Sequence, residues 1–139
     1  SSYRKIYKNH KMSVTITPTL SLSSTTTTGD TLSFSVTKSL ALGVNDVRLS
    51  KKYIVNDHSA SDAPKIFNNA TMGKSYVYVK NTHGTRTVHL GATTTTQATH
   101  AEIILAPGEF AFFPWAGVRD LFAIADADGG EVEVMIFEA

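Results

Sequence analysis

Residues 75–139 read SYVYVKNTHGTRTVHLGATTTTQATHAEIILAPGEFAFFPWAGVRDLFAIADADGGEVEVMIFEA and carry the clearest pattern of the chain. Apolar and polar residues alternate in several short segments, and residues rich in Gly, Asn and Asp separate them. Alternation with a period of two residues is typical of β-strands that bury one face. We therefore predict strands at 75–81, 86–91, 101–106, 109–115, 119–126 and 131–138.

Two segments of this stretch predict tight turns. Leu-Ala-Pro-Gly-Glu at 105–109 combines a proline, which presets φ, with a glycine, which accepts a positive φ. Asp-Ala-Asp-Gly-Gly at 126–130 predicts a turn that closes a hairpin between the last two strands.

The first half of the chain contains weaker strand signals. Apolar residues at 14, 16, 20 and 22 share one parity around Pro18, which predicts an edge strand or two short strands. Leu32, Phe34 and Val36 alternate with Ser and Thr, which predicts another strand. We expect a third strand within 47–55, broken around Lys51 and Lys52, and then an irregular segment over 56–74 with a helical turn near 64–68.

No segment shows a sustained apolar period of 3.6 residues, so long helices are not expected. About eight or nine short strands with turn signals between them predict an all-β fold. The specific expectation is a single-domain antiparallel β-sandwich that is jelly-roll-like. Its predicted core is Phe34, Val77, Val79, Ile103, Leu105 and Val134, whereas His89 has the opposite parity to its neighbours and is expected to face solvent.

Charge is distributed unevenly along the chain. The net charge is +1, but residues 1–11 contain Arg4, Lys5, Lys8 and Lys11 and no acidic residue. We therefore treat residues 1–11 as a basic N-terminal arm or a vector-derived segment, and residues 12–139 as the β-sandwich domain. The domain carries no basic footprint for nucleic acid, and no apolar run reaches membrane-spanning length, so neither partner is expected.

Four pieces of the sequence resemble a known group of proteins. They are YVYVKNT at 76–82, APGEFAFFP at 106–114, DLFA at 120–123 and IFE at 136–138. Their order resembles the C-terminal half of small virion structural proteins of tailed bacteriophages, in particular marine ones, and covers under half of the chain. The resemblance implies a non-enzymatic virion protein, either a capsid decoration protein or a head or tail appendage. It also implies a homo-oligomer, with a trimer favoured, and other virion proteins as partners.

The segment around Trp115 is the main candidate for an interface. Phe110 and Phe112 share one face of their strand with Pro114, while Phe113 and Trp115 share the other. Because both faces are apolar, we expect this strand to be buried twice, once in the core and once against a neighbouring copy or a covering loop. With the apolar residues of the basic arm, the interface candidates are Tyr3, Ile6, Tyr7, Phe110, Phe112, Phe113 and Trp115.

Two other functions are compatible with this pattern. Exposed aromatic residues could make the protein a carbohydrate-binding or receptor-binding module, with surface glycans as ligands. A degenerate cupin-like enzyme comes third, because Gly108, Pro114 and Gly117 resemble the second cupin motif. The histidine ligand expected after that glycine is absent, and residues 118–120 read Val-Arg-Asp instead.

The remaining chemical signals are weak. His58 lies between Asp57 and Ser59, but a catalytic triad draws its residues from separate elements, so turn chemistry explains this cluster better. Asp126, Asp128, Glu131 and Glu133 fail the spacing of an EF-hand loop. The chain has no Cys, which excludes disulfides and thiolate metal sites. We expect no catalytic residues, no cofactor and no bound metal.

Overall fold

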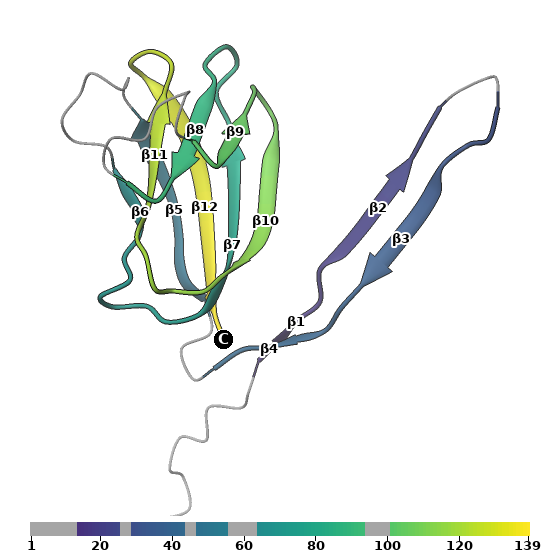
Figure 1. Ribbon diagram of the computed structural model, residues 1–139, viewed down its shortest axis with the longest axis horizontal. Coiled ribbons are helices and arrows are strands. Elements are labelled where there is room, and N and C mark those ends of the chain that lie inside the picture. Colours follow the sequence, from purple (N-terminus) through teal and green to yellow (C-terminus); the bar gives the residue numbers. More distant parts are fainter. Residues whose placement is uncertain (1–13, 26–28, 44–46, 56–63, 94–100) are drawn as a thin grey trace, which may run out of the picture. The chain divides into compact units, whose positions relative to one another are not determined.

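The computed structural model describes residues 14–25, 29–43, 47–55, 64–93 and 101–139, which form strands and no helix (Figure 1). Every strand pairing is antiparallel, so the predicted all-β class is confirmed. The twelve strands are β1 (Thr15–Ile16), β2 (Thr19–Ser23), β3 (Ser33–Thr37), β4 (Leu40–Ala41), β5 (Val47–Val55), β6 (Lys65–Phe67), β7 (Ser75–Asn81), β8 (Val88–Gly91), β9 (Ile103–Leu105), β10 (Phe110–Trp115), β11 (Leu121–Ala125) and β12 (Gly130–Glu138).

The chain divides into two compact units, Ser1–Asp46 and Val47–Ala139. We call the described part of the first unit, residues 14–25 and 29–43, the ribbon, and the second the two-sheet unit. The sequence did not indicate this division. The boundary proposed after residue 11 lies outside the described residues.

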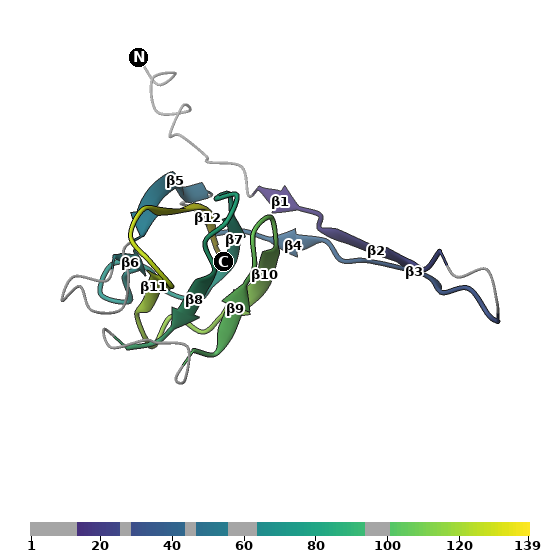
Figure 2. The same ribbon diagram turned by 90° about the horizontal axis from the view of Figure 1, so that it is seen from above.

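The two-sheet unit contains two four-stranded sheets, ordered β10-β7-β12-β5 and β6-β11-β8-β9. Figure 2 looks along the strands and shows the two sheets facing each other. Both sheets contribute to one core, which makes this unit β-sandwich-like. The buried core residues are Val77, Val79, Val132, Val134 and Ile136 from the first sheet, and Ile66, Phe67, Val88, Leu90, Leu105, Leu121, Ala123 and Ala125 from the second.

β12 organises the first sheet because it pairs along most of its length with both β5 and β7. Val134 lies opposite Val79, and Ile136 lies opposite Val77, and all four side chains are buried. The alternation in the sequence therefore corresponds to one face in the core and one face outside it. Burial of Val77, Val79, Leu105 and Val134 is confirmed, whereas Ile103 is half-buried against the core.

Two local predictions in the first half of this unit were wrong. β5 runs without interruption through Lys51 and Lys52, because the ladder with β12 continues through both residues. The predicted helical turn near residues 64–68 is instead β6, which pairs with β11 and buries Ile66 and Phe67. In both places pairing with a distant strand overrides the local signal.

Both predicted turns join the two sheets. The segment 126–130 connects β11 of the second sheet to β12 of the first, so the predicted terminal hairpin was wrong. The segment 105–109 likewise links β9 to β10 of the other sheet. Gly108 and Gly129 have φ values of 81° and 85°, which explains why glycine occupies these turns.

His89 does not face solvent as predicted. It lies on β8, between β9 and β11, and only 7% of its surface is exposed. Ile124 is its partner on β11 and is also buried, so the outer side of the second sheet is covered at this point.

The ribbon is a long two-stranded hairpin. β2 pairs with β3, and β1 pairs with β4 in the same register. Backbone hydrogen bonds extend this register from the Val14–Leu42 pair at one end to the Ser24–Leu32 pair at the other. Phe34 was predicted to be buried, but 48% of its surface is exposed, because its strand belongs to the ribbon and not to the sandwich-like core.

Asn81 is a fully buried polar residue at the end of β7. Its Nδ2 donates hydrogen bonds to the carbonyl oxygens of Arg86 (2.7 Å) and Leu105 (3.0 Å), and its Oδ1 accepts one from the His83 amide (3.0 Å). The side chain therefore ties the first sheet to β9 of the second, and all its hydrogen-bonding groups are used.

Gly117 allows a close contact between two backbone segments. Its φ is 79°, and a Cβ placed on it would lie 2.7 Å from the Lys74 nitrogen and closer still to the Gly73 carbonyl. Only glycine fits this position, because neither backbone segment has a flexible group that could move aside.

We predict that Gly117→Ala lowers the free energy of unfolding by several kcal/mol more than Gly108→Ala. Both substitutions place a side chain at positive φ, which costs about 1–2 kcal/mol, but only Gly117 also meets backbone atoms, since nothing lies within 4 Å of a Cβ at Gly108. Urea unfolding followed by the fluorescence of Trp115, the only tryptophan, measures the difference. Equal midpoints for the two variants would contradict the proposed close approach.

We also predict that Asn81→Asp destabilises the two-sheet unit by about 3 kcal/mol or more, because it removes both Nδ2 donors and leaves a buried carboxylate facing two carbonyl oxygens. Asn68→Asp is the matched control. The Asn68 Oδ1 accepts a hydrogen bond from the Ala70 amide (3.0 Å), which an aspartate retains. The same unfolding assay should show little change for the control, and a similar loss in both variants would argue against the role of Asn81.

Candidate functional site

The outward side of the first sheet presents a group of aromatic and apolar side chains. β7 lies between β10 and β12, so every second residue of these three strands points away from the core. We call this group the outer aromatic face, which consists of Tyr76, Tyr78, Phe110, Phe112, Pro114, Met135 and Phe137.

The rings of this face contact one another diagonally across β7 and β10. Tyr76 stacks on Phe112 with 6.4 Å between ring centroids and 10° between ring planes. Tyr78 lies 6.4 Å from Phe110 at an angle of 39°. The Lys74 Nζ lies 5.8 Å from the centroid of Tyr76, which places a cation at one edge of the face. The rings are therefore already arranged in the isolated chain.

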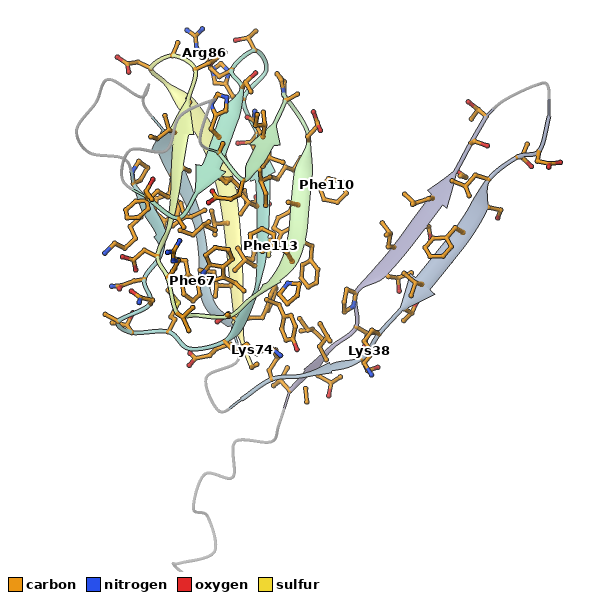
Figure 3. The ribbon with its side chains drawn as sticks, viewed as in Figure 1. Lys38, Phe67, Lys74, Arg86, Phe110 and Phe113 are labelled. Atoms are coloured by element: carbon orange, nitrogen blue, oxygen red, sulfur yellow. The ribbon has the colours of Figure 1, made fainter. Side chains whose placement is uncertain are left out.

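The two phenylalanines remain accessible despite these contacts. Phe110 is 63% exposed and Phe112 is 39% exposed. Figure 3 shows Phe110 pointing away from the two-sheet unit and Phe113 pointing into it. The assignment of these residues to opposite faces of the strand is therefore confirmed, and only the outward face is open.

Phe113 and Trp115 belong to the inner side of β10. Both are half-buried against the core, and their rings make an edge contact with centroids 5.9 Å apart. The Trp115 Nε1 donates a hydrogen bond to the Arg119 carbonyl oxygen (2.9 Å). Of the seven interface candidates, Phe110 and Phe112 thus lie on an open surface, and Phe113 and Trp115 support it from behind. Tyr3, Ile6 and Tyr7 lie outside the described residues.

The pKa of Tyr78 is raised above its usual value, first by partial burial of the phenol and second by the negative charge of Glu133 on the neighbouring strand. Both effects disfavour the phenolate. Deprotonation of Tyr78 at high pH would therefore place a disfavoured charge on this face.

The ribbon carries a second apolar surface that the sequence analysis missed. β2–β3 pairing places its apolar side chains on one side, each about half exposed, with exposed fractions from 46% to 53%. We call this surface the ribbon apolar face, which consists of Leu20, Leu22, Leu32, Phe34 and Val36. The shared parity of residues 20 and 22 and of 32, 34 and 36, on either side of a Ser/Thr-rich loop, was the available signal.

On the opposite side of the ribbon, the residues of β2 and β3 are all Ser or Thr. Thr19 and Thr37 hydroxyls lie 2.8 Å apart, and the Ser21 hydroxyl donates to that of Ser35 at 3.4 Å. The ribbon is thus amphipathic with no charged residue in either strand. Its polar side is polar only through the hydroxyl groups of Ser and Thr.

Groups that could support catalysis or metal binding do not converge in the part of the chain that is described. No cluster of three or more His, Cys, Asp or Glu side chains occurs among these residues. The His83 Nδ1 accepts hydrogen bonds from the amides of Thr85 (3.1 Å) and Arg86 (3.0 Å), so this ring stabilises its own turn. His10, His58 and His100, with Asp57 and Ser59, lie outside the described residues.

The residues that suggested a cupin or a calcium site have structural roles. Gly108 forms a turn, and Gly117 contacts the backbone at Gly73. Asp120 accepts a hydrogen bond from the Asn69 amide (2.9 Å) and pairs with Lys65 (3.2 Å). The Asn69 hydrogen bond and then Lys65 lower the pKa of Asp120.

Two of the four acidic residues near the last turn are engaged in the same way. The Asp126 Oδ1 accepts from the Thr87 amide (3.2 Å), and the Glu131 Oε1 accepts from the Thr82 hydroxyl (2.8 Å). These carboxylates hold the loop at 82–87 in place.

Comparison with known proteins does not extend these observations: no protein-family model and no curated protein matches the chain. A search of the described residues for helices that are long and apolar enough to cross a membrane finds none.

We predict that Glu133→Gln lowers the pKa of Tyr78 but leaves it above the usual value, because burial is the larger cause and remains. Because the folded-state pKa of Tyr78 is raised, the contribution of the neutral phenol to the free energy of unfolding is fully present below pH 10 and is lost as the pH rises through the raised pKa. Titration of the Tyr78 ring by NMR measures the shift. A Tyr78 pKa that does not fall in the Glu133→Gln variant would contradict the assignment.

Proposed function

We propose that this protein is a non-enzymatic structural protein of a phage virion that acts by assembling with copies of itself. The observation that carries the proposal is the outer aromatic face, an open and ordered set of rings above a well-packed core. Aromatic residues in this setting are typical of the energetic centre of protein interfaces. A capsid decoration protein or a head or tail appendage, bound to other virion proteins, fits this surface.

The positions of the resembling pieces support this assignment. YVYVKNT includes most of β7, APGEFAFFP includes most of β10, and IFE ends β12. These three strands lie side by side in one sheet, although they are far apart in sequence. The fourth piece, DLFA, lies at the start of β11 in the other sheet. Three of the four pieces are thus on the sheet that carries the outer aromatic face. The same resemblance favours a trimer. The number of short strands separated by turn signals favours a jelly-roll connection of the two sheets.

Glycan or receptor binding is the second candidate, and one observation favours it. Phe110 is 63% exposed, and Phe112 and Tyr76 form a stacked pair beside it. Flat exposed rings can stack on a sugar as well as on a neighbouring protein. The two functions differ in whether the free protein is oligomeric before any ligand is added.

We expect the purified chain to be an oligomer at micromolar concentration, and Phe110→Ser with Phe112→Ser to dissociate it. Loss of two central aromatic side chains should raise the dissociation constant by about tenfold or more for each. Light scattering measures the mass against the 15.0 kDa of one chain. Val118→Ser is the matched control, because Val118 is apolar and 75% exposed in the same unit but lies outside the outer aromatic face.

A wild-type monomer would contradict the proposal. If that monomer bound immobilised glycans and lost this binding in the Phe110 and Phe112 variant, the binding-module function would replace it. An oligomer whose mass is unchanged in the double variant would show that the interface lies elsewhere.

A further inference from the structure

The ribbon apolar face has no cover within the ribbon. All five of its side chains are about half exposed, and the ribbon has only two strands at any point. A two-stranded hairpin is marginally stable in water, because it has no second layer against which to bury its apolar side. The ribbon therefore requires an additional apolar surface for its own stability.

The charges of the ribbon indicate what that surface is. Residues 14–43 contain only two charged side chains, Asp30 and Lys38. Natural sheet edges are normally protected from association by charged residues, and β2 and β3 have none. A partner with a charged surface would find nothing to pair with along these strands, whereas a second ribbon offers an equally uncharged apolar face.

The positions of the two charges select one arrangement of two ribbons. Asp30 precedes β3 on the side of the hairpin loop, Lys38 follows β3 at its other end, and Phe34 lies midway between them. Neither charge forms an ion pair with the described residues of its own chain. If two ribbons pack in opposite directions, Lys38 of each lies near the partner's Asp30. If they pack in the same direction, like charges meet at both ends.

We propose that the ribbon packs its apolar face against the apolar face of the ribbon of a second copy, in opposite directions, around a two-fold axis at the Leu22–Phe34 pair. Leu22 and Phe34 face each other across β2 and β3, so their side chains form the centre of this contact. Two such ribbons make a small two-layer sandwich, and each supplies the second layer that the other lacks.

This contact rests on the proposed function, because five side chains are few for an interface that is stable alone. Stable interfaces bury about 1,200–2,000 Å². When copies are already held together through the outer aromatic face, the high effective concentration makes a weak ribbon contact sufficient. The ribbon then links assembled copies to one another, which a decoration or appendage protein requires.

Cysteine cross-linking tests the direction of packing, because the chain contains no native Cys. Full-length Asp30→Cys and Lys38→Cys proteins are mixed in equal amounts and treated with a short bismaleimide. Because each mixed pair retains one Lys38–Asp30 contact, we expect cross-links between positions 30 and 38 to exceed the 30–30 and 38–38 products at least tenfold. Excess of the like-position products, or no cross-links, would each overturn the proposal.

Substitution of the ribbon faces tests the contact itself. Leu22→Ser with Phe34→Ser should reduce ribbon-linked species in sedimentation at least tenfold. The matched control is Ser21→Ala with Ser35→Ala, which changes the neighbouring pair on the hydroxyl side and should change the amount of ribbon-linked species less than twofold.

Because the apolar variant could also unfold the ribbon, a second pair of variants leaves both strands unchanged. Asp30→Lys should reduce ribbon linkage, and adding Lys38→Asp should restore it. Failure of the charge exchange to restore linkage would contradict the opposed packing.

The two proposals fail in different ways. If the oligomer persists but no cross-link between ribbons forms, the ribbon inference is wrong and the proposed function stands. If ribbons cross-link at high concentration while the protein is a monomer at micromolar concentration, the outer aromatic face is not an interface and the ribbon contact stands alone. Trp115 fluorescence verifies in every variant that the two-sheet unit is folded.

Discussion

The pairing of β7 with β12 is the constraint on which the two-sheet unit depends. It places Val79 opposite Val134 and Val77 opposite Ile136 in the core, and by the same register it places Tyr78 opposite Met135 outside. A shift of one residue would exchange the two sets, burying phenols and exposing valines. The free energy of core formation therefore also determines which residues make the outer aromatic face. The outer aromatic face is thus a consequence of the same register that makes the fold stable.

Two specific contacts hold the rest of the unit to this central pair. Asn81 bonds the end of β7 to β9, so it connects the two sheets through a buried polar side chain with no unused group. Gly117 lets the segment after β10 contact the backbone that precedes β7. Both contacts lie near β10, the strand that carries Phe110 and Phe112. The rings are consequently held before any partner arrives, which lowers the entropic cost of binding.

The ribbon, unlike the two-sheet unit, is not stabilised by a core of its own. Its strands pair along a long register, but the residues on both sides of β2 and β3 are exposed. In the assembly that we propose, the outer aromatic face binds without further ordering, whereas the ribbon gains its second layer only through association. The proposed assembly would therefore be stepwise, with copies first meeting through the outer aromatic face and the ribbons associating afterwards.

The sequence by itself determined the all-β class, the strands at 75–81 and 131–138 and the opposite orientations of Phe110 and Phe113, because alternation depends only on neighbouring residues. It did not determine what each face would meet. The acidic turn at 126–130 looked like a hairpin, although its strands belong to different sheets, and Lys51 and Lys52 lie within a continuous strand because β12 pairs with them. Phe34 was predicted to be buried and His89 to face solvent, and both predictions were wrong for the same reason. Alternation shows that a strand has two different faces, but burial depends on residues distant in sequence, and only the tertiary structure brings those residues together.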